Sequence, residues 1–290
     1  MLRIFGSCFA LALMLAPLSA SALPNAAVTD PPRNAAFPAH NQQLLIPSQG
    51  LGMNAVLFIA SGKGPHPTVI LMHGLPGNER NLDLAQAIRR AGWNVLTFTY
   101  RGAWGSPGDF SIANLMEDAA AALEFARSPR GAKLGIDVRH IVLAGHSMGG
   151  AAALLTAARL GGVDGLILLD AANLAATARQ ESRDELIAGL DDLGNSLHGA
   201  SRDGIADEIL SRGAQWDNEV AAARLNGLPV LSLASRHALG PVNRPVNAAL
   251  TRAGAHLTAT EMDTDHAFAD HRIALATAVV RWLRALGVRP

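Results

Sequence analysis

The sequence has few charged residues, few lysines and a single cysteine, and each shortage excludes a class of protein. Charged residues make up 17% of the 290 residues and apolar residues 49%, a balance that excludes a disordered chain. Lysine occurs only at positions 63 and 133, and the arginines that supply the other cations are scattered. Without a basic block, the chain is not expected to bind nucleic acid. Its length suits one large domain or two small ones.

The first 22 residues are typical of a secretory signal peptide. Arg3 precedes an apolar run from Phe9 to Leu18, and Ala20-Ser21-Ala22 forms a small-residue cleavage site. The run is short for a bilayer span, which argues against an N-terminal membrane anchor. We therefore expect export to the periplasm or the medium, with no stable membrane insertion after cleavage. Cleavage would also remove Cys8, so the mature chain would have no disulfide, thiolate nucleophile or cysteine-bound metal.

The rest of the chain is expected to be a flexible leader over residues 23–40 and one domain over 41–290. Within that domain, short apolar segments alternate with segments of helical spacing, which predicts a mostly parallel sheet covered by helices on both faces. Residues 173–226 contain no clear strand and predict a helical insertion, or cap, after the sixth strand. The expected strands are residues 54–60, 68–72, 94–100, 140–144, 163–169, 229–234 and 256–262. The expected helices are residues 81–90, 112–127, 149–160, 242–253 and 273–286.

The strongest chemical motif surrounds Ser147. Gly145-His146-Ser147-Met148-Gly149-Gly150 follows a predicted strand and leads directly into an alanine-rich helix. G-x-S-x-G between a strand and a helix is the pattern of a nucleophile elbow, a tight turn that presents the serine above the sheet edge. The flanking glycines avoid clashes with neighbouring backbone. We therefore expect Ser147 to be a catalytic nucleophile.

With this motif the chain resembles the α/β-hydrolase superfamily over nearly its whole mature length. The most similar groups are the bacterial serine hydrolases of the prolyl-oligopeptidase-like and dienelactone-hydrolase-like types. Three further segments carry the resemblance: His73-Gly74-Leu75-Pro76-Gly77, the segment from Tyr100 to Gly108, and Asp265-His266. The resemblance implies an α/β-hydrolase fold and hydrolysis of a small-molecule acyl substrate, an ester or thioester rather than an amide, through an acyl-enzyme intermediate.

The same resemblance suggests an oxyanion hole made of two backbone N–H groups. One would come from Met148, the residue after the nucleophile, and the other from Leu75 in the loop after the strand at 68–72. His73 in that loop is expected to support the turn rather than to titrate during catalysis.

The general base should follow the last strand, because the superfamily order is serine, acid, histidine. His266 lies between the strand at 256–262 and the helix from Ile273, in a loop that can bring an imidazole to Ser147. His271 is the alternative, although its place at the start of the final helix makes it less suitable.

The acid that would orient the base departs from the superfamily pattern. The usual position is the loop after the strand at 229–234, but no Asp or Glu occurs anywhere from Val220 to Thr260. Asp170, which directly follows the strand at 163–169, is the favoured substitute, with a Ser-His dyad next. Asp263 and Asp265 remain further alternatives.

Two other functions remain as alternatives, the first of them motivated by the acid-free loop. The chain could be a noncatalytic binding protein that kept the fold and lost the acid, or a serine peptidase for short peptides. Arg101 would either bind a substrate carboxylate or tie its loop together. No metal-ligand spacing and no phosphate or dinucleotide fingerprint is present, so we expect neither a metal nor a cofactor.

Overall fold

The computed structural model describes residues 25–193 and 196–289, and it confirms the predicted sheet covered on both faces. Eight strands form one sheet in the order β1-β2-β4-β3-β5-β6-β7-β8. The pairs β1–β2 and β2–β4 are antiparallel, and all other neighbours are parallel. The strands are β1 (His40–Ser48), β2 (Leu51–Ile59), β3 (His66–Met72), β4 (Asn94–Phe98), β5 (Ile136–His146), β6 (Gly165–Leu169), β7 (Pro229–Ser235) and β8 (His256–Met262).

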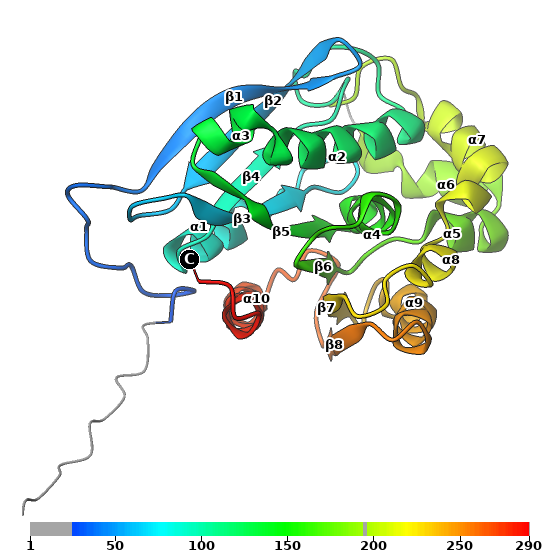
Figure 1. Ribbon diagram of the computed structural model, residues 1–290. Coiled ribbons are helices and arrows are strands. Elements are labelled where there is room, and N and C mark those ends of the chain that lie inside the picture. Colours follow the sequence, from blue (N-terminus) through cyan, green and yellow to red (C-terminus); the bar gives the residue numbers. More distant parts are fainter. Residues whose placement is uncertain (1–24, 194–195, 290) are drawn as a thin grey trace, which may run out of the picture.

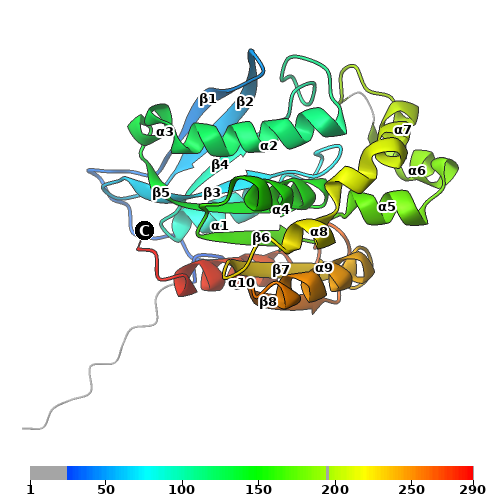
Figure 2. The ribbon, with the colours of Figure 1, turned by 45° about the vertical axis from the view of Figure 1, so that its right-hand side comes forward.

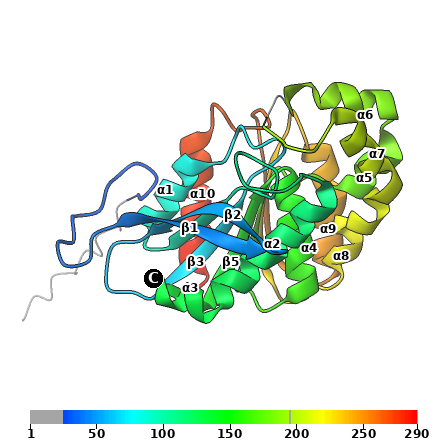
Figure 3. The same ribbon diagram turned by 90° about the horizontal axis from the view of Figure 1, so that it is seen from above.

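Helices cover the two faces unequally (Figures 1 and 3). α1 (Leu82–Arg90) and α10 (Arg272–Ala285) lie together on one face, whereas the other face carries α2 (Ile112–Arg127), the short α3 (Pro129–Lys133), α4 (Met148–Leu160) and α9 (Gly240–Arg252). The central strands are buried on both sides, which explains why they read as continuous apolar runs. In β6, for example, Leu166 and Leu168 pack toward the α2–α4 face, and Ile167 and Leu169 pack toward the α1–α10 face.

The N-terminal hairpin is the main difference from the predicted strands. The first strand was expected at 54–60, but β2 begins at Leu51 and β1 precedes it, mostly over residues for which no strand or helix was predicted. The turn residues Gln49 and Gly50 both have positive φ, 46° and 79°, as a two-residue hairpin turn requires. Polar, exposed residues such as Gln42 and Gln43 hide β1 from an argument based on apolar runs, because this edge strand is only partly buried.

The structure describes only part of the predicted N-terminal segments. The predicted signal peptide, residues 1–22, lies outside the described residues and stays a prediction. Within the predicted leader, residues 25–39 contain no helix or strand, and Ala26 is buried, with its carbonyl accepting a hydrogen bond from Arg90 Nε at 2.6 Å. Among the described residues, no helix is both long and apolar enough to cross a membrane.

The predicted helical insertion is present between β6 and β7, at one end of the sheet (Figure 2). It consists of α5 (Leu174–Gln180), α6 (Arg183–Gly189), η1 (Asp191–Leu193), α7 (Arg202–Arg212), η2 (Gly213–Trp216) and α8 (Asn218–Ala222). Polar contacts from α7 and from the segment before it help to hold it to the main domain. The Glu208 carboxylate accepts the N–H groups of Ile112 and Ala113 at the start of α2, at 2.8 and 3.0 Å. His198 exchanges backbone hydrogen bonds with Gly102 and Phe110.

Candidate active site

Ser147 occupies a strained turn between β5 and α4. Its φ of 55° and ψ of −122° are rare for a residue with a side chain. A Cβ on Gly145 would lie 2.1 Å from the carbonyl oxygen of Gly149, and one on Gly149 would lie 2.4 Å from that of Met72. Both glycines are therefore required by close backbone contacts, which allow the turn to be this tight.

Hydrogen bonds join this turn to the neighbouring strand. Ser147 N donates to Leu169 O at 3.0 Å, and Ala172 N donates to Ser147 O at 2.9 Å. The nucleophile candidate is thus held in register with the end of β6, where Asp170 begins the next loop.

His266 and Asp170 meet directly, although 96 positions separate them in sequence. His266 Nδ1 lies 2.6 Å from Asp170 Oδ2, and the Asp170 side chain is completely buried. The same carboxylate accepts the N–H groups of Ser235 at 2.9 Å and Leu239 at 3.2 Å. Because a carboxylate accepts hydrogen bonds, Nδ1 carries the proton and Nε2 of a neutral His266 is a free base.

The other candidates for the acid and the base have different partners. Asp263 contacts His237 Nε2 at 2.8 Å and Arg236 at 3.3 Å. Asp265 accepts the N–H of Ala269 at 2.8 Å, and His271 Nδ1 lies 2.9 Å from its neighbour Asp270. Of the four carboxylate alternatives, including none, the geometry supports Asp170.

A residue that sequence reasoning missed supports His266 from the other side. His146 Nε2 donates to the backbone carbonyl of His266 at 2.8 Å, and the centroids of the two imidazole rings lie 4.5 Å apart. Burial, followed by the nearby His266, lowers the pKa of His146 to about 4, so its ring is neutral. The available signal was its place directly before Ser147 in the motif, but its contact depends on the tertiary structure.

The loop after β3 lies against the nucleophile. A Cβ on Gly74 would be 2.8 Å from Ser147 Cβ, so this approach requires glycine. Leu75 from this loop and Met148 at the start of α4 line the same cavity as Ser147. The two predicted oxyanion donors therefore belong to the segments that border Ser147.

His73 and two aromatic residues fix this loop. His73 Nδ1 donates to Gly74 O at 2.7 Å, and burial lowers the pKa of His73 to about 4. Tyr100 donates its hydroxyl to His73 O at 3.1 Å, and Trp104 Nε1 donates to Pro76 O at 2.8 Å. His73 is thus a neutral support for the turn.

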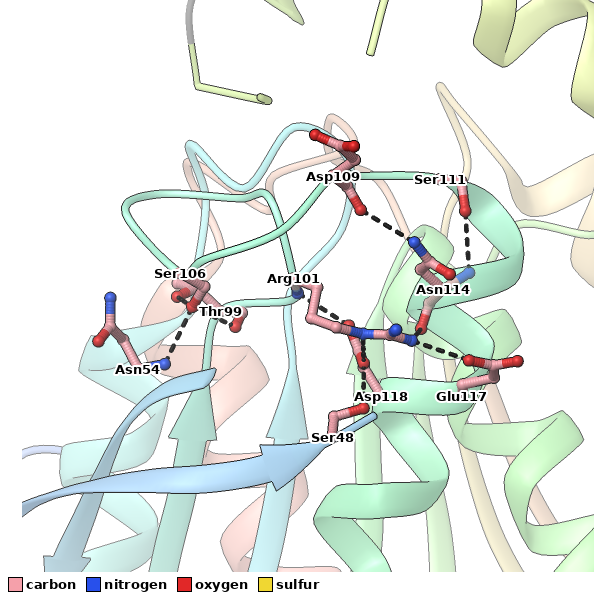
Figure 4. A network of polar contacts seen from close by, with 10 residues as sticks. All are labelled: Ser48, Asn54, Thr99, Arg101, Ser106, Asp109, Ser111, Asn114, Glu117 and Asp118. Atoms are coloured by element: carbon pink, nitrogen blue, oxygen red, sulfur yellow. Dashed lines mark hydrogen bonds and ion pairs between the residues drawn. The ribbon is translucent and has the colours of Figure 1, made fainter. Parts of the chain in front are cut away.

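Arg101 ties its loop to α2 and is not free to bind a substrate carboxylate (Figure 4). Its buried guanidinium donates to Asp118 at 2.5 Å and to Glu117 at 2.9 Å. Asp118 is fully buried and also accepts the hydroxyl of Ser48 at 2.6 Å. The second of the two predicted roles, holding loop backbone together, is therefore the one this network supports.

Ser147 and His266 open into one cavity of about 630 Å³. The insertion supplies much of its apolar wall through Leu174, Leu186, Leu190, Leu193 and Ile209. Among the described residues, no group of three or more His, Cys, Asp or Glu side chains is arranged to hold a metal ion.

A parallel sheet covered on both faces, with a serine elbow at the carboxyl end of a central strand, defines the α/β-hydrolase class. Residues 69–287 match the alpha/beta hydrolase family, and the chain belongs to that family. An uncharacterized protein of Mycobacterium tuberculosis (strain ATCC 25618 / H37Rv) is 30% identical over 125 residues, a match that spans 43% of each chain and thus less than half of that relative.

Solved structures show the same fold. EstE1, a thermostable carboxylesterase cloned from a metagenomic library, is 20% identical with a TM-score of 0.63, covering 91% of this chain and 92% of that one. Est1E from Butyrivibrio proteoclasticus is 18% identical with a TM-score of 0.65, covering 85% and 99%. A hyperthermophilic esterase from Pyrobaculum calidifontis is 19% identical with a TM-score of 0.65, covering 88% of each chain.

Proposed function

We propose that this chain is a serine hydrolase that cleaves a carboxylic ester or related acyl bond through an acyl-enzyme intermediate. One observation carries the proposal: Ser147, on a strained turn, shares a cavity with His266, whose Nδ1 lies 2.6 Å from the buried Asp170. A serine, a base and an orienting carboxylate are the parts that nucleophilic acyl transfer requires.

The chemistry follows from these positions. His266 Nε2 takes the proton of Ser147 Oγ as that oxygen attacks the carbonyl carbon, and Asp170 stabilises the imidazolium that forms. His266 then gives the proton to the leaving alcohol oxygen, and the C–O bond breaks to leave an acyl-serine. A water molecule, deprotonated by His266, attacks the acyl-serine, releasing the carboxylic acid and restoring Ser147.

The oxyanion of both tetrahedral intermediates needs donors near Ser147. We assign the N–H groups of Leu75 and Met148 to this role, because both residues border the cavity at the nucleophile. Met148 is the first residue of α4, where backbone N–H groups have no acceptor within the helix and the helix dipole favours negative charge.

The similar folds named as esterases support an ester in preference to an amide. The direct test is labelling with a fluorophosphonate probe, alongside hydrolysis of p-nitrophenyl butyrate by the wild-type chain and Ser147→Ala. We expect labelling and hydrolysis that both disappear in the variant. Labelling without ester hydrolysis, together with release of p-nitroaniline from an aminoacyl anilide, would favour the peptidase alternative. No Ser147-dependent labelling would favour the noncatalytic binding protein.

We also propose export of the mature chain, on the basis of the signal-like sequence at residues 1–22. Expression of the full chain in a Gram-negative host, followed by N-terminal sequencing of the periplasmic fraction, should give a mature protein beginning at Leu23. A cytoplasmic protein that retains Met1 would contradict export.

A further inference from the structure

The catalytic cavity has charge of only one sign on its walls. Among the described residues that line it, Glu79 and Glu181 carry the only acidic side chains, and none is Lys or Arg. The two lining histidines do not reverse this sign, because burial lowers the pKa of His146 to about 4 and His266 is already paired through Nδ1 with the Asp170 carboxylate.

The two glutamates come from different parts of the chain that both line the cavity. Glu79 lies in the loop that follows β3, near the oxyanion donor Leu75, whereas Glu181 ends α5 in the insertion. A substrate bound at Ser147 therefore shares its cavity with one carboxylate from the main domain and one from the insertion.

Glu181 has no counter-charge in the part of the chain that the structure describes. Among the described residues, no cation or hydrogen-bond donor contacts its carboxylate, whereas its neighbour Glu185 accepts the N–H and hydroxyl of Ser182 in a capping box. Partial burial, followed by repulsion from Glu185, raises the pKa of Glu181. A cation placed in the cavity would stabilise the charged form of Glu181, and an anion would add to the repulsion on it.

Glu79 is only partly neutralised. Its carboxylate accepts the N–H of Asn81, and Arg272, a cation that interacts with it, is itself paired with Asp83 through Nε and Nη2. Since Arg272 is already paired, the Glu79 charge still acts on the cavity.

Apolar walls make these charges more effective. Leu186, Leu190, Leu193 and Ile209 from the insertion exclude water from much of the cavity surface. Between low-dielectric walls, charge–charge interactions are less screened than at an open surface. The same walls favour a substrate with an apolar body.

We propose that this cavity selects its substrate by charge: it takes esters that have an apolar body and a cationic or neutral end, and it rejects esters with an anionic end. The inference rests on the proposed ester hydrolysis, and it assigns Glu79 and Glu181 as specificity-determining residues.

Three butyrate esters of nearly equal shape test the selection. Their alcohols are choline, 3,3-dimethylbutanol and 2-hydroxyethanesulfonate, which end in a cation, a neutral tert-butyl group and an anion. A second series carries the same three ends on the acyl chain, as ethyl esters of 4-(trimethylammonio)butyrate, 5,5-dimethylhexanoate and 4-sulfobutyrate. We expect kcat/KM to decrease from cation to neutral to anion in at least one series, by about tenfold per step at low salt.

Salt and variants identify the cause. In 1 M NaCl, where the screening length is about 3 Å, the differences should shrink. In Glu79→Gln/Glu181→Gln the ratios between the three esters should approach one, and in Glu181→Lys the anionic ester should gain relative to the cationic one. Glu124→Gln, an exposed position on α2 away from the cavity, is the matched control and should keep the wild-type ratios.

The outcomes separate the two proposals. If the neutral esters are cleaved in a Ser147-dependent manner but both series show equal rates for all three charges, the charge selection is wrong and the hydrolase proposal stands. If the ratios persist in the double glutamine variant, the two glutamates are not their cause and the assignment is overturned. If no ester is cleaved at all, the proposed function itself fails.

Discussion

The loops after β6 and β7 leave adjacent parallel strands at the same edge of the sheet, yet they contribute opposite kinds of group. The loop after β6 supplies a carboxylate, Asp170. The end of β7 and the loop that follows it contain no carboxylate and instead donate the N–H groups of Ser235 and Leu239 to Asp170. In the proposed active site, the orienting acid therefore lies one strand away from its usual position, and the usual position supplies hydrogen-bond donors to it.

Local geometry explains why the exchange is possible. Neighbouring strands lie about 4.8 Å apart, so a side chain at the end of β6 can reach the space above β7. Asp170 has a φ of 43°, a left-handed conformation that aspartate tolerates better than most residues. The loop that carries His266, residues 263–271 between β8 and α10, is called the base loop here. It is held at three points: by Asp170 after β6, by His146 at the end of β5 and by Ser235 at the end of β7. Removing these contacts one at a time tests what each strand contributes.

The largest effect is expected from Asp170→Asn. An amide cannot hold Nδ1–H of His266 as a carboxylate does, so kcat for an ester substrate should fall by about 10⁴. Steady-state kinetics of purified protein would measure it.

The matched control is Asp263→Asn, which removes a carboxylate from the base loop itself. Asp263 is exposed and pairs with His237 and Arg236, so kcat should stay within about twofold of wild type. Equal losses in both variants would break the distinction between the two loops.

The second effect concerns stability at acid pH. His73 and His146 have pKa values lowered from 6.5 to about 4, so the folded chain binds fewer protons than the unfolded chain between these values. Their stabilising effect is complete above about pH 6.5 and is lost as the pH falls toward 4, at a cost of about 3 kcal/mol for each histidine. Urea unfolding at pH 7 and pH 4 measures the difference. In His146→Phe the loss should be smaller by roughly half, and an equal loss would contradict the assignment.

The third effect is expected from His146→Phe on catalysis. The variant keeps a ring beside His266 but removes the N–H that donates to the His266 carbonyl, so kcat should fall by about tenfold with little change in KM. His146→Gln retains a donor and should recover part of the loss. Wild-type kcat in His146→Phe would show that β5 does not position the base.

The smallest effect is expected from Ser235→Ala. Its hydroxyl donates to Thr264 O in the base loop, and its loss leaves a buried carbonyl without that donor. The free energy of unfolding should decrease by about 1–2 kcal/mol, measured by urea unfolding. Ser232→Ala is the control on the same strand, because the buried Ser232 hydroxyl has no partner among the described residues. A larger destabilisation in the control than in Ser235→Ala would rule out this role for β7.

Much of the fold was predictable from apolar periodicity. The helix at 112–127 and the strand at 256–262 have the predicted bounds, and other elements shift by a few residues. β1 was not predicted, because an edge strand with polar, exposed residues lacks the apolar run that indicates a buried strand. The elbow at Ser147 was visible because its strain requires glycines at fixed local spacing.

Arg101 shows the opposite case, because its local sequence allowed both a substrate contact and a loop support. Only the packing of its loop against α2, with Asp118 buried beside it, separated the two.

By itself, the sequence determined the alternation of strands and helices, the serine turn, and the absence of any acid after β7, since each of these is a property of neighbouring residues. The tertiary structure decided which carboxylate meets His266 and which side chains surround it. Those contacts join the ends of β5, β6 and β7 to the loop after β8, and no local pattern encodes distances between segments that only the sheet brings together.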